Sequence, residues 1–299
     1  MRVFKRIALF LLVNIAIIAL ISIIASVFKL DIYYLKPNGL DLKALLIFSI
    51  LIGFIGSLIS LFLSKRIAKW MLKVRVIKTP QNTDDSRLVE IISRIATQRG
   101  TKVPEIGIYP SKEVNAFATG WSKNHSLIAV SEGLLQEMNQ DELEGVLAHE
   151  MTHVTNGDMV TMVLLQGVLN TFVIFLSRVV AYVVMNALGR GGREMGYFSY
   201  YLMSIVFQIV FGILASMIVF SFSRRREFRA DLGGAQVVGK SKMIAALKRL
   251  QQLSNKVDTK QQSLSTMKIS DKRGRFGRVF STHPSLEKRI EVLQKTMVN

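Results

Sequence analysis

Two histidines and a glutamate near the middle of the chain have the types and spacing of a hydrolytic metal site. His149 and His153 lie four positions apart in the sequence Ala-His-Glu-Met-Thr-His. On a helix, such residues project from one face, one turn above the other. Both imidazoles can then bind one zinc ion, at about 2.0–2.1 Å per nitrogen. Glu150 follows the first histidine, and in a His-Glu-x-x-His sequence this glutamate is the general base that acts on a water.

The residues around this motif predict the helix that would carry it. Asn139 and Glu142 have the spacing of a capping box at a helix start. Apolar residues then recur at helical spacing and form a stripe that can hold the metal-bearing face rigid. These residues are Leu143, Val146, Leu147, Met151 and Val154.

A catalytic zinc ion needs a third protein ligand and one open position. The chain has no cysteine, so the candidates are His125, His283 and the carboxylates. His125 lies in a polar turn and is predicted to be at the surface. Glu227 and Asp231 are spaced i and i+4, so one could bind the metal while the other accepts a hydrogen bond from a ligand histidine. The alternative is that these two carboxylates pair with neighbouring arginines.

Four long apolar segments predict a membrane protein: residues 7–28, 44–63, 159–188 and 200–222. The first is about 33 Å long as a helix, enough to cross a bilayer, and longer than the apolar part of a signal peptide. We therefore expect an uncleaved anchor. The last two predict a transmembrane hairpin, with packing onto a soluble domain as the alternative.

The formal net charge of +18 comes from 39 Lys and Arg against 21 Asp and Glu. Basic residues follow the second and the fourth apolar segments, at 65–78 and 224–226. The positive-inside rule places these regions, and with them the histidine motif, in the cytoplasm. No nucleic-acid-binding module is recognisable, so we predict no nucleic-acid partner.

From about residue 80 the composition becomes that of a soluble α/β domain. An amphipathic helix is predicted to end near Gly100, and short strands are predicted at 104–109, 114–119 and 127–130. The segment 115–120 could be an edge strand that pairs with an extended substrate, or an ordinary packed strand. Residues 255–278 are polar and are predicted to form a loop. A final amphipathic helix is predicted around 286–293.

Three motifs together resemble the HtpX family of membrane zinc metalloproteases, which is related to the type 1 protease of prenylated proteins. They are His-Glu-Met-Thr-His at 149–153, Arg-Glu-Phe-Arg-Ala-Asp at 226–231 and Ser-Thr-His-Pro at 281–284. The resemblance covers almost the whole chain. It implies that His149, His153 and Glu227 are the zinc ligands and that Glu150 is the catalytic base. It also implies that Asp231 contacts a ligand from the second shell and that Asn115 lies beside the substrate.

His283 and Arg289 form a His-Pro-x-x-x-x-Arg pattern. In relatives of the HtpX family this region approaches the active site. The resemblance therefore implies that either residue could donate to the oxyanion, because the charge that develops on the carbonyl oxygen needs a positioned donor. For His283, a polar residue at a helix start is the alternative.

The predicted fold is a mainly α membrane protein with about four transmembrane helices and an α+β, zincin-like cytoplasmic metalloprotease domain. Its expected parts are two N-terminal membrane helices and a basic segment (1–79), the first part of the catalytic domain (80–158), the membrane hairpin (159–222) and the second part of the catalytic domain (223–299).

The predicted activity is zinc-dependent hydrolysis of peptide bonds, with one Zn²⁺ per chain. The resemblance implies misfolded or damaged membrane proteins, or other unfolded polypeptides, as substrates, and a multi-pass location in a prokaryotic plasma (inner) membrane. Two other classes remain. A scaffold or sensor with structural zinc would usually have four protein ligands. A transporter would need polar residues within the spans, such as Gln166, Asn170 and Gln208.

Overall fold

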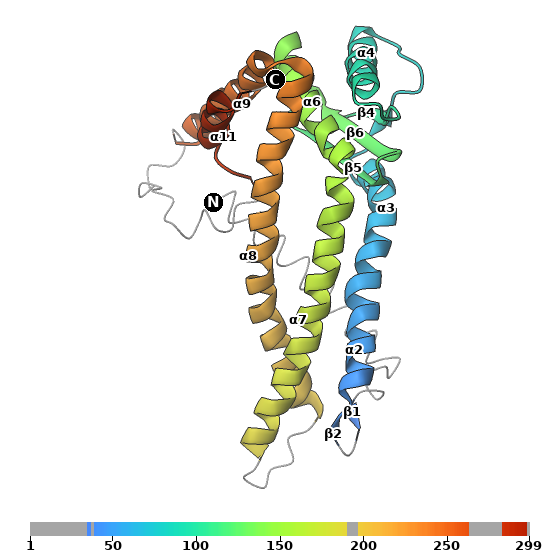
Figure 1. Cartoon of the computed structure of the whole chain (residues 1–299), viewed down its shortest axis with the longest axis vertical. Coiled ribbons are helices and arrows are strands. Elements are labelled where there is room, and N and C mark those ends of the chain that lie inside the picture. The colour runs from blue at the N-terminus through green and yellow to red at the C-terminus, as the bar shows by residue number, and fades with distance from the viewer. Residues whose placement is uncertain (1–34, 37–38, 190–196, 263–282, 298–299) are drawn as a thin grey trace. The chain divides into compact units, whose positions relative to one another are not determined.

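The computed structural model describes residues 35–36, 39–189, 197–262 and 283–297. They belong to two compact units, which Figure 1 draws together although their relative positions are not determined. Among the described residues, the first unit comprises those up to Ile59 and Val163–Ser221, and the second comprises all the others. The anchor predicted at residues 7–28 lies outside the described residues.

Three helices in the described part of the chain are long and apolar enough to cross a membrane: Leu42–Met71, Asp158–Leu188 and Phe198–Val238. The first consists of α2 (Leu42–Ile50), a π-helical turn η2 (Leu51–Ile55) and α3 (Gly56–Met71). A short hairpin, β1 (Leu35–Lys36) and β2 (Gly39–Leu40), precedes it. The three spans correspond to the second, third and fourth predicted segments.

The helices α7 (Asp158–Gly189) and α8 (Tyr197–Val238) extend from the first unit into the second. Within the first unit, α7 packs closely on the π-helical turn, because a Cβ at Gly53 would lie 2.5 Å from the backbone nitrogen of Thr171. The helix α8 continues unbroken through the three arginines at 224–226, which are good helix formers. The apolar segment and the carboxylates that follow it are therefore parts of one helix.

A mixed four-stranded sheet lies in the second unit, with strand order β3-β4-β6-β5. The strands are β3 (Arg75–Val76), β4 (Glu105–Tyr109), β5 (Ala116–Ser122) and β6 (His125–Ser131). The pair β4–β6 is parallel, and β3–β4 and β5–β6 are antiparallel. The strand β5 is at the edge of this sheet, so one side of its backbone is available for pairing.

The remaining helices of the second unit are α4 (Thr83–Gln98), α5 (Glu132–Glu137), α6 (Gln140–Asn156), α9 (Lys240–Gln262) and α11 (Leu286–Lys295). One apolar cluster joins α4, α6 and the sheet, and its fully buried members include Leu88, Ile92, Ile128, Leu143, Leu147 and Met151. The apolar stripe predicted for the motif helix is thus the part of α6 that faces the core.

Part of one predicted loop is helical in the structure. Residues 255–262, predicted as the start of a loop, continue α9 to Gln262. This stretch contains no glycine or proline, so nothing in it stops the helix. The rest of the predicted loop lies outside the described residues.

Candidate metal centre

Both ends of α6 have the caps that fix its position. The side chain of Asn139 accepts a hydrogen bond from the backbone nitrogen of Glu142 at 3.0 Å, and the Glu142 carboxylate accepts one from the backbone nitrogen of Asn139 at 3.0 Å. The predicted capping box is therefore present. At the other end, Gly157 adopts the left-handed conformation (φ 69°), which ends α6 and allows α7 to begin at Asp158.

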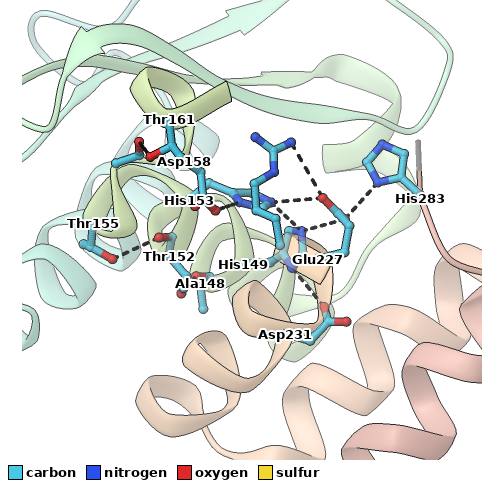
Figure 2. A network of polar contacts seen from close by, with 12 residues as sticks. Ala148, His149, Thr152, His153, Thr155, Asp158, Thr161, Glu227, Asp231 and His283 are labelled. Carbon is cyan, nitrogen blue, oxygen red and sulfur yellow. Dashed lines mark hydrogen bonds and ion pairs between the residues drawn. The ribbon is translucent and has the colours of Figure 1, made fainter. Parts of the chain in front are cut away.

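Two glycines allow α8 to approach α6 closely. A Cβ at Gly233 would lie 2.5 Å from Cγ2 of Thr152, and a Cβ at Gly234 would lie 3.2 Å from the backbone nitrogen of His149. Glu227 and Asp231 are also on α8. Glu227 lies about two turns before these glycines and Asp231 about one turn before them. Figure 2 shows both carboxylates pointing toward the histidines of α6.

The side chains of His149, His153 and Glu227 form a compact triangle of potential metal ligands. Nε2 of His149 is 3.1 Å from Nε2 of His153. The Glu227 carboxylate oxygens are 3.5 Å from Nε2 of His149 and 3.4 Å from Nε2 of His153. For ligands at about 2.0–2.1 Å from a zinc ion, neighbouring corners of a tetrahedron are about 3.3–3.4 Å apart. The triangle therefore has the size that a tetrahedral zinc ion requires.

The other ring nitrogens determine which tautomer each histidine adopts. Nδ1 of His149 is 2.9 Å from Oδ1 of Asp231, and Nδ1 of His153 is 2.6 Å from Oδ2 of Asp158. An ionised carboxylate only accepts hydrogen bonds, so each Nδ1 carries the hydrogen. In the neutral imidazoles both Nε2 lone pairs then face each other and the Glu227 carboxylate. A cation between them removes this repulsion, and the carboxylates orient the ligand rings.

Burial disfavours the charged form of His153, but hydrogen bonds to Asp158 and Glu227 outweigh this effect and raise the pKa of His153 to about 9. Burial also opposes the charged form of His149, and hydrogen bonds to Asp231 and Glu227 raise its pKa above the ordinary value. Protons therefore compete with a metal for both Nε2 atoms, and metal binding must release protons.

The carboxylate of Glu227 is fully buried, and its contacts with His149, His153 and His283 are hydrogen bonds only when the facing ring nitrogen carries a hydrogen. A buried charge without such bonds is costly, and a bound cation offsets this cost. The buried carboxylate and the two facing lone pairs fit a metal ion held by His149, His153 and Glu227, the three residues whose ligand atoms lie within 4.8 Å of one another.

Arg289 and His283 both reach this cluster from the C-terminal part of the chain. The guanidinium of Arg289 is buried and donates two hydrogen bonds to Asp231, from Nε at 2.7 Å and from Nη2 at 2.5 Å. Its Nη1 is 3.5 Å from Oε2 of Glu227. These contacts favour a positioning role for Arg289 over direct donation to an oxyanion.

His283 is largely exposed, with 61% of its side chain accessible, and its Nδ1 is 2.8 Å from Oε2 of Glu227. It lies at the solvent side of the cluster, where a substrate carbonyl could reach it. Its predicted role as an oxyanion donor stays a prediction.

Glu150 is half-buried on α6, directly after the first histidine ligand candidate. Its charge also contributes to the raised pKa of His153. Asn115 is exposed just before β5, and its backbone nitrogen donates to Oγ of Ser131 at 3.1 Å. Its carbonyl accepts from the backbone nitrogen of Ser131 at 2.9 Å. The backbone of Asn115 is therefore held in place while its side chain is accessible.

Asp158 contacts a candidate metal ligand, His153, but the sequence did not single it out. It lies five positions after His153 and beyond the end of the motif helix, so helical spacing does not predict that the two side chains meet. The signal was Gly157: a glycine that ends a helix in the left-handed conformation redirects the chain, so the first residue of the next helix can return to the last turn of the previous one.

We expect the variant Asp158→Asn to bind zinc about 10–100-fold more weakly than the wild type, the usual effect of removing a hydrogen-bond partner of a ligand histidine. Asparagine can still accept from Nδ1 of His153 but carries no charge. Competition with a chelator of known affinity measures the change. Asp141→Asn, which removes a largely exposed carboxylate from the first turn of α6, should leave the affinity unchanged. Equal zinc affinity in both variants would contradict the assigned role.

Two histidines of one helix, a buried glutamate from a second helix and a glutamate next to the first histidine define a metal-dependent peptidase site. Residues 82–297 match Peptidase family M48, and the chain belongs to this family. It is 50% identical over 292 residues to "Protease HtpX" of Pseudoalteromonas atlantica, a match that covers 97% of this chain and 99% of the relative. It is 48% identical over 298 residues to "Protease HtpX homolog" of Bacillus licheniformis, with 97% and 99% covered.

Among solved structures, the chain is similar to the crystal structure of S. mikatae Ste24p, with a TM-score of 0.60 and 19% identity. That match covers 95% of this chain and 67% of the other, and it supports the fold alone. The predictions of a metallopeptidase, of a resemblance to the HtpX family and of a mainly α membrane fold with a small sheet are therefore confirmed. The chain is a membrane metalloprotease, and its relatives indicate a bacterial membrane.

Proposed function

We propose that this protein is a zinc-dependent endopeptidase that hydrolyses peptide bonds of misfolded or damaged membrane proteins in the plasma membrane. The observation that carries the proposal is the triangle of His149, His153 and Glu227, whose edges have the length expected around tetrahedral zinc. Two histidines and a glutamate are a ligand set of catalytic zinc in metallopeptidases, and they leave a fourth position open.

When bound, zinc polarises the substrate carbonyl and lowers the pKa of water. Glu150 takes the proton of the attacking water and then passes it to the nitrogen of the leaving amine. Asp231 and Asp158 hold the two imidazoles so that their Nε2 atoms point to one place, and Arg289 fixes Asp231. His283 is the candidate donor to the oxyanion, because it is the exposed polar group next to Glu227.

The substrate of this proposal binds as an extended strand. The strand β5 lies at the edge of the sheet, and α6 packs beside it. A peptide that pairs with β5 presents backbone groups independently of its sequence, which suits an enzyme that acts on unfolded segments. The exposed Asn115, whose backbone is fixed by Ser131, is placed to hydrogen-bond such a peptide.

The test is cleavage of an unfolded membrane protein by the purified full chain in detergent, with and without zinc. We expect zinc-dependent hydrolysis that a chelator stops. Asn115→Ala should raise KM about 10-fold with little change in kcat or zinc content, because it removes about one hydrogen bond to the substrate. Zinc retention without any hydrolysis would instead favour a structural metal. Hydrolysis with an unchanged KM in Asn115→Ala would remove this residue from the substrate site.

The catalytic unit is proposed to face the cytoplasm, because basic residues cluster at 65–78 and 224–226. The chain has no cysteine, so single cysteines can report the side of the membrane. Exposed positions such as Lys102 and Glu90, changed to cysteine, should react with an impermeant thiol reagent only after the membrane is opened. Labelling of intact cells would overturn the orientation without affecting the proposed chemistry.

A further inference from the structure

A cavity of about 380 Å³ with both polar and apolar lining residues lies in the second unit, and none of the three metal-ligand candidates lines it. The helices α6, α7 and α8 form its walls, together with Arg99, the residue directly after α4. Its lining includes Arg99, Asn156, Asp158, Thr161, Arg229 and Gln236. This volume is within the range of small-molecule sites, which also combine a few placed polar groups with apolar walls.

The charged groups of this cavity favour an anion. Arg99 and Arg229 line it, and neither guanidinium has a carboxylate at ion-pair distance within the described part of the chain. The one acidic residue of the lining, Asp158, is bound to Nδ1 of His153 at 2.6 Å. Its single negative charge stands against two positive ones, so the lining keeps a net positive charge.

Arg99 also has an unused donor. Its Nη2 donates to the backbone carbonyl of Gly233, which holds the side chain against α8. Its Nε is buried and has no hydrogen-bond partner among the described residues. A buried donor of this kind is costly unless a ligand or water accepts its hydrogen bond.

We propose that this cavity binds a phosphate group, held by Arg99 and Arg229. Guanidinium groups bind phosphate through two parallel hydrogen bonds, and side-chain amides such as those of Asn156 and Gln236 can complete the shell. The phosphate belongs either to a small soluble molecule or to an anionic lipid. An anionic lipid is one of the two sources because Thr161 and Phe222 are on helices long and apolar enough to cross a membrane.

The experiment uses the full chain, loaded with metal and carrying Glu150→Gln so that it does not digest itself. In one arm, inorganic phosphate is titrated into protein in an uncharged detergent by calorimetry, with chloride at the same ionic strength as the blank. In the other arm, protein from bilayer discs of phosphatidylcholine with or without phosphatidylglycerol is analysed by native mass spectrometry for retained lipid. Arg99→Gln and Arg229→Gln are compared with Arg225→Gln, a matched control on an exposed position of α8 outside the cavity.

We expect one saturable site in at least one arm, and the arm that shows it identifies the source of the phosphate. Each cavity variant should weaken binding about 10-fold or more, whereas Arg225→Gln should bind normally, because only the first two remove a charge-assisted contact. If Arg99→Gln fails to fold without its bond to Gly233, the exposed Arg229→Gln decides the result alone. The absence of saturable binding in both arms, or equal binding by Arg229→Gln and Arg225→Gln, would overturn the proposal.

Discussion

Replacing Glu227 by alanine is expected to reduce bound zinc from one ion per chain to almost none and to abolish proteolysis with it. Glu227 supplies the only carboxylate oxygens within 3.5 Å of both Nε2 atoms in the described part of the chain. Without it, two imidazoles remain, and a catalytic zinc site needs three protein ligands. Metal analysis after dialysis against a buffered zinc concentration measures the effect.

The control for this experiment is Glu90→Gln, which removes an exposed carboxylate from α4 and should keep its zinc. Circular dichroism should show that Glu227→Ala retains its helices. This measurement distinguishes the loss of a zinc ligand from unfolding. Unchanged zinc content in Glu227→Ala would remove this residue from the ligand set.

Since protons compete with zinc for both histidines, the zinc affinity of the wild type should fall as the pH is lowered below about 9, the pKa of His153.

The second large effect is expected from Glu150→Gln, which should retain zinc but lose peptide-bond hydrolysis by at least about 10²–10⁴-fold. This is the typical contribution of a general base. Glutamine has almost the same size as glutamate, so packing on α6 is preserved, but its amide cannot accept the proton of the attacking water. Single-turnover cleavage and metal content should be measured on the same sample.

Two controls make this result specific to Glu150. Glu142→Gln changes a carboxylate on the same helix that caps its N-terminus and should lower thermal stability with little effect on kcat. Zinc analysis excludes metal loss as the cause of inactivity. A zinc-loaded Glu150→Gln enzyme that cleaves at the wild-type rate would show that another group takes the proton.

The local features of the site could be predicted from the sequence, since they depend on spacing along one helix. The capping box of Asn139 and Glu142, the shared face of His149 and His153 and the apolar face of α6 all follow from helical periodicity. Three strands of the sheet, β4, β5 and β6, were predicted with boundaries a few residues from those observed, because turn residues mark strand ends only approximately. The two-residue strand β3 was not predicted.

The contacts between distant segments could not be derived in this way. A pair of carboxylates at 227 and 231 left two interpretations open, a metal site or pairing with neighbouring arginines. The structure pairs Asp231 with Arg289, a residue of α11, and with His149 instead. The small residues Gly233 and Gly234 were the available signal for a close helix contact, but a sequence does not tell which helix approaches them.

The most direct test of the metal centre is X-ray absorption spectroscopy at the zinc edge on the full chain with Glu150→Gln. We expect a zinc ion with nitrogen and oxygen ligands only, at about 2.0–2.1 Å, and a scattering pattern of two imidazoles. Changing His283 should leave this pattern unchanged, whereas changing His149 or His153 should abolish it. Three imidazoles, or a pattern that survives the loss of His149 or His153, would contradict a site built from His149, His153 and Glu227.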